Sequence, residues 1–218
     1  MKTLVPLLAG LAALAEPTGA QASDNAFEFW LNPSVAVGLD EDTGIELETA
    51  QRFRSAADGR PDTYFARLWL NQDVSDGLTI GGAVERRVNN GGADETRTMQ
   101  QLSLKSGVFR GRLRLEQRSV DEADRMGLRL RPRLGVAVPL GDAGKWSLES
   151  NAELFLTLRS TSRGGNEGLT GLRTQLAVSR EISNRLSLSA GYLRQQDIDR
   201  DGPDTVGHAP IIGIELEF

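Results

Sequence analysis

From Ser23 onward, the chain is a succession of long segments in which apolar and polar residues alternate, separated by short clusters of Gly, Asp, Asn and Ser. Successive side chains of a β-strand point to opposite faces, so a period of two predicts strands. The segments are about ten to fourteen residues long, whereas strands of globular proteins average about five or six. They match the ~9–11 tilted residues with which a barrel strand crosses an outer membrane.

We predict eleven such strands along the chain. They cover Ala26–Leu39, Gly44–Arg54, Asp62–Asp73, Leu78–Val88, Thr96–Ser106, Val108–Val120, Gly127–Leu140, Trp146–Arg159, Leu169–Ile182, Leu186–Gln196 and His208–Phe218.

The connections between these strands fall into two classes that alternate along the chain. The tight ones are Asp73–Gly77, Ser106-Gly107, Gly141–Lys145 and Ile182–Arg185. The longer, polar and glycine-rich ones are Ser55–Pro61, Asn89–Glu95, Asp121–Met126, Ser160–Gly168 and Asp197–Gly207. Short periplasmic turns and longer extracellular loops are typical of outer-membrane barrels.

The alternation also predicts which side chains face the inside of such a barrel, because the lumen is polar and the outer wall apolar. In Val108–Val120, for example, five charged residues share one face, and Phe109, Leu113 and Leu115 occupy the other. The predicted lumen-lining residues are Glu46, Glu48, Arg110, Arg112, Arg114, Glu116, Arg118, Arg129, Arg131, Arg133, Glu149 and Glu153.

A soluble β-sandwich also alternates, with its polar face in water and its apolar face in a shared core. Strand length, the two classes of connection and the two ends of the chain favour the barrel instead. The fold class predicted is therefore an all-β transmembrane antiparallel barrel of about 10–12 strands with a charged lumen.

The first residues have the pattern of a cleavable secretory signal peptide. Lys2 supplies a positive start, Leu4–Ala15 is a short apolar run, and Ala20-Gln21-Ala22 is a small-x-small cleavage site. About a dozen apolar residues interrupted by Pro6 cannot cross ~30 Å of hydrocarbon as a helix. We predict cleavage after Ala22, which makes residues 1–22 the signal peptide and residues 23–218 the barrel domain of a Gram-negative outer-membrane protein.

The last strand ends the chain on an aromatic residue, in the sequence Ile212-Gly213-Ile214-Glu215-Leu216-Glu217-Phe218. A terminal Phe on an amphipathic strand resembles the signal that outer-membrane proteins present to their insertion machinery. The aromatic residues expected at the two membrane rims are Phe53, Tyr64, Phe109, Trp146, Tyr192 and Phe218.

The strand count conflicts with one rule. Bacterial single-chain barrels have an even number of strands and both ends on the periplasmic side, whereas the pattern gives eleven. Pro33 interrupts Ala26–Leu39, so this segment is expected to drop out, leaving ten strands, or to divide, giving twelve. Parallel closure of the first and last strands is a third, less favoured option.

Several short motifs resemble a family of bacterial outer-membrane barrels catalogued as domain of unknown function 2490. The motifs are Phe29-Trp30-Leu31-Asn32, Arg112-Leu113-Arg114-Leu115-Glu116-Gln117-Arg118, the Arg129–Arg133 alternation, Glu153-Leu154-Phe155 and Gly191-Tyr192. The resemblance covers essentially the whole mature chain. It implies a β-barrel outer-membrane protein, and it implies no particular activity.

Charge and composition exclude several classes of function. The net charge of −5 is spread along the chain without a basic block, which argues against nucleic acid as a partner. The chain has no cysteine, so disulfides, thiolate metal sites and a lipid-modified Cys are excluded.

Two candidates for chemistry are weak. His208 is the only histidine and has no His-x-Ser-Asn-Gly pattern of a rim lipase around it. The loop Asp197–Gly202 spaces carboxylates by two, as a calcium loop does, but His208 stands where an EF-hand needs Glu. We predict no catalytic residue, no metal site and no cofactor.

The function predicted is a narrow channel or binding barrel for a small polar or anionic solute, with the arginines as its selectivity element. The first alternative is a structural barrel whose lumen is closed by salt bridges, and the second is a rim enzyme acting on membrane lipid through His208. Inward Trp30, Trp69 and Phe155 are expected to stack on arginine or to fill part of the lumen. The partners expected are outer-membrane lipid, lipopolysaccharide and the insertion machinery.

Overall fold

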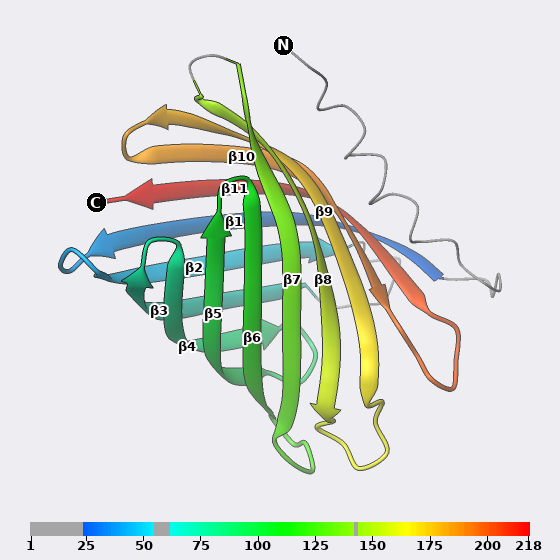
Figure 1. Cartoon of the computed structure of the whole chain (residues 1–218). Helices are drawn as coiled ribbons and strands as arrows, with labels where there is room; N and C mark the ends of the chain where they lie inside the picture. Colours follow the sequence, from blue (N-terminus) through cyan, green and yellow to red (C-terminus); the bar gives the residue numbers. More distant parts are fainter. Residues whose placement is uncertain (1–23, 55–61, 142–143) are drawn as a thin grey trace.

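A computed structural model describes residues 24–54, 62–141 and 144–218 of the chain, and these residues form a closed barrel of eleven strands (Figure 1). The strands are β1 (Asp24–Gly38), β2 (Thr43–Arg54), β3 (Thr63–Ser75), β4 (Leu78–Asn89), β5 (Glu95–Ser106), β6 (Phe109–Val120), β7 (Gly127–Leu140), β8 (Trp146–Arg159), β9 (Gly168–Ser183), β10 (Leu186–Asp197) and β11 (Thr205–Glu217). Within the described ranges, no helix is long and apolar enough to cross a membrane.

Most strand limits lie within two residues of the predicted ones, and those of β7 and β8 coincide with them. The largest difference is at the start of β11, which begins three residues before the predicted His208. Thr205, Val206 and Gly207 pair with β1 and β10 on both sides, which keeps them extended despite the nearby Pro203 and Gly202. The predicted signal peptide and the Ser55–Pro61 connection lie outside the described residues.

The barrel closes between its first and last strands, which run parallel. All other neighbouring pairs are antiparallel and consecutive in the sequence. Figure 1 shows β1 and β11 side by side along most of their length. The expectation of ten or twelve strands is therefore wrong, and the less favoured parallel closure is the one observed.

Pro33 explains why this expectation failed. Proline has no N–H group and normally breaks a central strand. Here the pairing between β1 and β2 passes over Asn32 and Pro33, while the parallel pairing with β11 continues through both of them. One interrupted ladder is thus tolerated because the other neighbour holds β1 in place.

The two ends of the barrel differ. The β1–β2, β3–β4, β5–β6, β7–β8 and β9–β10 connections lie at one end, which we call the turn end, together with Phe218. The longer connections that the structure describes, residues 90–94, 121–126, 160–167 and 198–204, lie at the opposite end, which we call the loop end. At the turn end, a Cβ added to Gly77 would lie 2.2 Å from the carbonyl oxygen of Lys105, and its φ of 84° also requires glycine.

The outer wall carries large apolar side chains, and the interior carries charged ones. Leu134 is 74% exposed and Phe109 is 60% exposed, whereas Glu85 and Glu116 are completely buried. The six aromatic residues predicted for the rims, Phe53, Tyr64, Phe109, Trp146, Tyr192 and Phe218, are all exposed on the outside. The facing inferred from the alternation is therefore confirmed.

Candidate functional site

The interior holds a cavity of about 1280 Å³, which we call the chamber. Residues of three turn-end connections line it, among them Asp42, Asp76 and Gly144. None of the described loop-end residues in 90–94, 121–126, 160–167 and 198–204 lines it. A second cavity of only about 40 Å³ lies beyond Trp30 and Arg52. The chamber therefore reaches the turn end and becomes filled towards the loop end.

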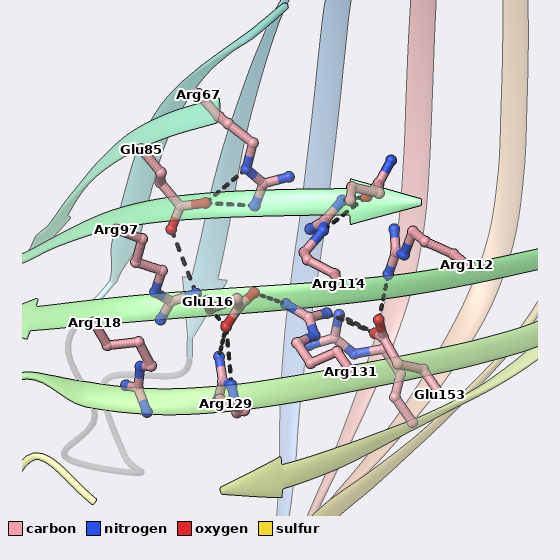
Figure 2. Close-up of polar contacts among 12 residues, drawn as sticks. Arg67, Glu85, Arg97, Arg112, Arg114, Glu116, Arg118, Arg129, Arg131 and Glu153 are labelled. Carbon is pink, nitrogen blue, oxygen red and sulfur yellow. Dashed lines mark hydrogen bonds and ion pairs between the residues drawn. The ribbon is translucent and has the colours of Figure 1, made fainter. Parts of the chain in front are cut away.

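What fills the loop-end half is a continuous chain of arginine and glutamate side chains from eight neighbouring strands, β2 to β9. Figure 2 shows its central part. Alternation places a charged side chain inside at every second position, and adjacent strands bring these positions into register. Glu85, Glu116 and Glu153, on β4, β6 and β8, form its centres. We call this set the Arg–Glu chain.

Glu116 lies at the middle of the Arg–Glu chain. Its Oε2 accepts hydrogen bonds from Nε and Nη2 of Arg129 at 2.9 and 2.6 Å, and its Oε1 accepts one from Nη1 of Arg131 at 2.6 Å. Arg97 Nη1 lies 4.0 Å from Glu116 and 3.5 Å from Glu85, so this arginine joins two of the centres. A fully buried carboxylate is stable here only because guanidinium groups surround it.

Arg131 makes the second link of the chain. Its Nη2 donates to Oε2 of Glu153 at 2.6 Å, and Arg112 donates to the other oxygen of the same carboxylate. At the far side, Arg67 donates through Nε to Glu85 at 2.9 Å, and Arg87 donates through Nη2 at 3.0 Å. Forked guanidinium groups thus bridge carboxylates of nearby strands along the inner wall, which a lysine cannot do with the same geometry.

Aromatic rings pack against the planar faces of several of these guanidinium groups. Arg52 lies 3.8 Å from the centroid of the Trp30 ring, Arg114 lies 4.8 Å from that of Trp69, and Arg131 lies 4.6 Å from that of Phe155. Trp30, Trp69 and Phe155 are buried inside the barrel. The predicted stacking of these three rings on arginine is therefore confirmed.

Within the Arg–Glu chain, positive charge exceeds negative charge. Five carboxylates, Glu48, Glu85, Glu95, Glu116 and Glu153, pair with eight arginines, Arg67, Arg87, Arg97, Arg112, Arg118, Arg129, Arg131 and Arg173. Arg114 instead donates to the neutral amide of Gln101 at 2.8 and 2.6 Å. Each of these carboxylates except Glu48 is shared by two or three arginines, so the chain leaves a surplus of guanidinium groups.

The turn-end half carries carboxylates without an arginine partner. Glu149 accepts a hydrogen bond from the hydroxyl of Ser179 at 2.7 Å. Among the described residues, no ion pair reaches Glu46, Glu149 or Glu215. The chamber thus has a positive deep end and a more negative wall near its mouth.

The predicted lumen-lining residues divide into three groups. Nine of them lie in the chamber wall: Glu46, Glu48, Arg112, Arg114, Arg129, Arg131, Arg133, Glu149 and Glu153. Glu116 and Arg118 do not line the chamber, since one is enclosed by the Arg–Glu chain and the other pairs with Glu95 near the loop end. Arg110 lines the chamber only at its mouth, where it donates to the carbonyl oxygens of Gly107 and Phe109 at 2.7 and 2.8 Å.

Sequence reasoning missed an important part of the Arg–Glu chain, namely Arg67, Glu85, Arg87, Glu95, Arg97 and Arg173. On β5 the outer face carries the polar Thr98 and Gln100, so hydropathy does not distinguish inside from outside there. On β4 the exposed Val84 and Val88 flank Arg86, so the alternation does mark Glu85 and Arg87 as inward, a signal that was overlooked. Arg86 points outward to Asp94 and Asp121, and the adjacent Arg87 points inward to Glu85. A signal was present in the pairing of Glu85 with Arg97 between neighbouring strands.

The two weaker candidates lie elsewhere. His208 is on the outer wall, where its Nδ1 lies 2.6 Å from the Tyr192 hydroxyl. In the acidic loop, the backbone N–H of Asp201 and the side chain of Asn166 donate to Asp199, and they hold the pKa of its carboxyl below its ordinary value. Within the described residues, no group of three or more His, Cys, Asp or Glu side chains is arranged to hold a metal ion.

Fold and interior together define a closed eleven-stranded β-barrel with a charged, partly filled lumen. Residues 27–206 match the model of the family described as protein of unknown function (DUF2490), and the chain belongs to this family. It is also similar to an uncharacterised protein of Methylorubrum extorquens strain AM1, with 29% identity over 202 residues that cover 87% of each chain. The predicted family membership is therefore confirmed.

Proposed function

We propose that this chain is a non-catalytic outer-membrane barrel whose chamber takes up small polar or anionic solutes from the turn end. The observation that carries the proposal is the chamber of about 1280 Å³, lined by charged and polar side chains and continuous with the turn end. A cavity of this kind is large enough for a small solute together with water.

The outer wall supports the membrane part of the proposal. Exposed leucines such as Leu68, Leu134 and Leu158 form an apolar surface that would be costly in water and is favourable in hydrocarbon. Aromatic residues stand at both rims, and at the turn end Arg180 lies 4.9 Å from the ring centroid of Trp146. An arginine on an interfacial tryptophan suits the level of lipid headgroups.

The charge distribution supports anionic or polar solutes. The chamber is lined at its deep end by arginines that outnumber their carboxylate partners, so its field attracts negative charge. In outer-membrane barrels the short turns face the periplasm, so the proposed orientation opens the chamber to that side.

Planar bilayers containing the purified protein test the channel form of this function. We expect small single-channel steps that favour anions, with a reversal potential that moves towards cation selectivity in Arg112→Ala. Arg112 lines the chamber and pairs with Glu153, so its loss removes positive charge from the pathway. Absence of steps, together with absence of solute binding in detergent, would overturn the proposal.

One observation favours a second candidate, a structural barrel with a closed lumen. The Arg–Glu chain spans eight strands and fills the loop-end half, as expected of a salt-bridged core. The two candidates differ in the turn-end half. A structural barrel binds no solute there, whereas a chamber does.

A further inference from the structure

The deep end of the chamber contains an unusual arrangement of guanidinium groups around three aromatic rings. Arg52 and Arg87 lie 5.6 and 5.0 Å from the centroid of Phe65. Arg52 and Arg173 share Trp30, and Arg173 and Arg129 share Phe155. We call Arg52, Arg87, Arg129 and Arg173, with these rings, the arginine collar.

Three of the four collar arginines have partners. Arg87 pairs with Glu85, Arg129 pairs with Glu116, and Arg173 donates to Gln195 and lies 3.6 Å from Glu153. These carboxylates are shared with Arg67, Arg97, Arg131 and Arg112. None of the three arginines therefore has a carboxylate partner that it does not share.

Arg52 is different. Its side chain makes no hydrogen bond or ion pair with another side chain in the described part of the chain, and its buried Nε has no partner. The neighbouring carboxylate of Glu28 is already occupied by Trp30 Nε1 at 2.7 Å and Arg54 Nε at 2.9 Å. A guanidinium nitrogen that is buried without a partner loses hydration and gains little in return.

The position of Arg52 in the lumen is a second distinguishing feature. Arg52 lines both the chamber and the small cavity beyond it, together with Trp30, Leu193, Gln195 and Asp197. It therefore stands at the partition between the two spaces. All four collar arginines line the chamber, so they border one common volume.

We propose that the arginine collar is a binding site for an oxyanion, either a phosphate group or a carboxylate group of a small solute. The planar fork of Arg52 fits two oxygen atoms of such a group, and Arg87 and Arg173 approach it from neighbouring rings. A bound oxyanion supplies the partner that Arg52 lacks and offsets the surplus positive charge. This inference rests on the proposed function, because the anion reaches the collar through the chamber.

The stacking on Trp30 also fixes the orientation of the guanidinium plane. With Trp30 against one face, the N–H groups of Arg52 are directed along the edge of that plane. A spherical halide uses such a fork less well than an oxyanion does. The collar is therefore expected to prefer phosphate and carboxylate over chloride.

The test is calorimetric titration of the folded full-length protein in detergent at low ionic strength, with inorganic phosphate in one arm and succinate in the other. We expect saturable binding of at least one of them. Arg52→Gln weakens it by about tenfold to a hundredfold, the effect of losing a charge-assisted pair of hydrogen bonds. Arg52→Lys, which keeps the charge but loses the fork, lies between the parent and Arg52→Gln.

Arg86→Gln is the matched control, because Arg86 is on the outer wall and its partners are Asp94 and Asp121. It is expected to bind as the parent does. Retained gel mobility of the folded barrel shows that each variant is intact. Equal binding by the parent and Arg52→Gln, or no saturable binding of either anion by the parent, overturns the collar site.

The two proposals fail in different ways. If phosphate and succinate do not bind but the parent still conducts ions, the collar inference is wrong and the chamber remains. If conductance and all solute binding are absent, the proposed function itself is wrong.

Discussion

The two halves of the lumen share the same strands but are filled differently. Along the inner face of β7, Arg129, Arg131 and Arg133 are followed by Gly135 and Ala137 towards the turn end. On the inner face of β10, the turn-end residues Ser187 and Ser189 are also small. Side-chain length therefore decides where the barrel is filled and where a chamber remains.

The halves also differ in how charge is compensated. In the loop-end half the carboxylates are buried within several guanidinium groups, whereas Glu149 in the turn-end half is bonded to hydroxyl groups. Removing one member of a buried ion pair leaves the other charge buried without a partner. Removing a carboxylate that is partly hydrated and bonded to hydroxyl groups leaves no such charge behind. The same substitution should thus have very different effects in the two halves.

The largest effect is expected for Glu153→Gln on β8. Glu153 bonds Arg112 and Arg131, so its neutralisation leaves two buried arginines short of a partner and destabilises the barrel by about 3–5 kcal/mol. Urea unfolding in lipid vesicles, followed by tryptophan fluorescence, measures the free energy of unfolding. Glu149→Gln, four positions earlier on the same face of this strand, is the matched control, with a loss below about 1 kcal/mol. Equal losses in the two variants would contradict the comparison.

A second test removes two of the side chains that fill the loop-end half of the lumen. In the double variant Glu116→Ala with Arg131→Ala, both members of a central pair are lost, and the loop-end half becomes wider. We expect a several-fold larger single-channel conductance in planar bilayers, because the narrowest part of the lumen is opened. Glu46→Ala, which widens only the chamber, should leave the conductance close to that of the parent. An unchanged conductance in the double variant would place the constriction elsewhere.

The smallest effect concerns acid stability at the two mouths. Backbone N–H groups of Asp42 and Asp201 lower the pKa of Asp40 at the turn end and of Asp199 at the loop end, respectively. A lowered pKa contributes stability above the ordinary aspartate value of about 4, and this contribution is lost as the pH falls through the lowered value. Urea midpoints measured through this acid range should fall slightly less in Asp199→Asn than in the parent. An identical acid profile would show that Asp199 does not titrate in this way.

The sequence predicts the wall of the barrel better than its contents. Alternation fixes facing because a one-residue shift would move every apolar side chain inside, and the predicted limits of β7 and β8 are those observed. The way in which the barrel closes was harder to predict. Whether Pro33 ends a strand depends on its pairing with β11, which is far away in the sequence.

The candidate site shows the same limit. The arginines of β6 and β7 were predicted because leucines mark their outer face. Arg97 was missed because the outer face of β5 carries Thr98 and Gln100, so both faces of that strand are polar near its loop end. Glu85 was missed although Val84 and Val88 mark the outer face of β4, because Arg86 and Arg87 place charges on both faces of that strand. Which arginine shares which carboxylate depends on register across the closed barrel, and alternation within one strand does not contain that information.

The most direct test of the account uses the absence of cysteine from the chain, since a single introduced thiol is then unique. Leu134→Cys lies on the outer wall and Ser189→Cys in the chamber. Reaction with a charged, water-soluble thiol reagent is measured for both variants after insertion into lipid vesicles. We predict that the thiol at position 189 reacts and that the thiol at position 134 is protected by hydrocarbon. Rapid reaction at position 134 would contradict it.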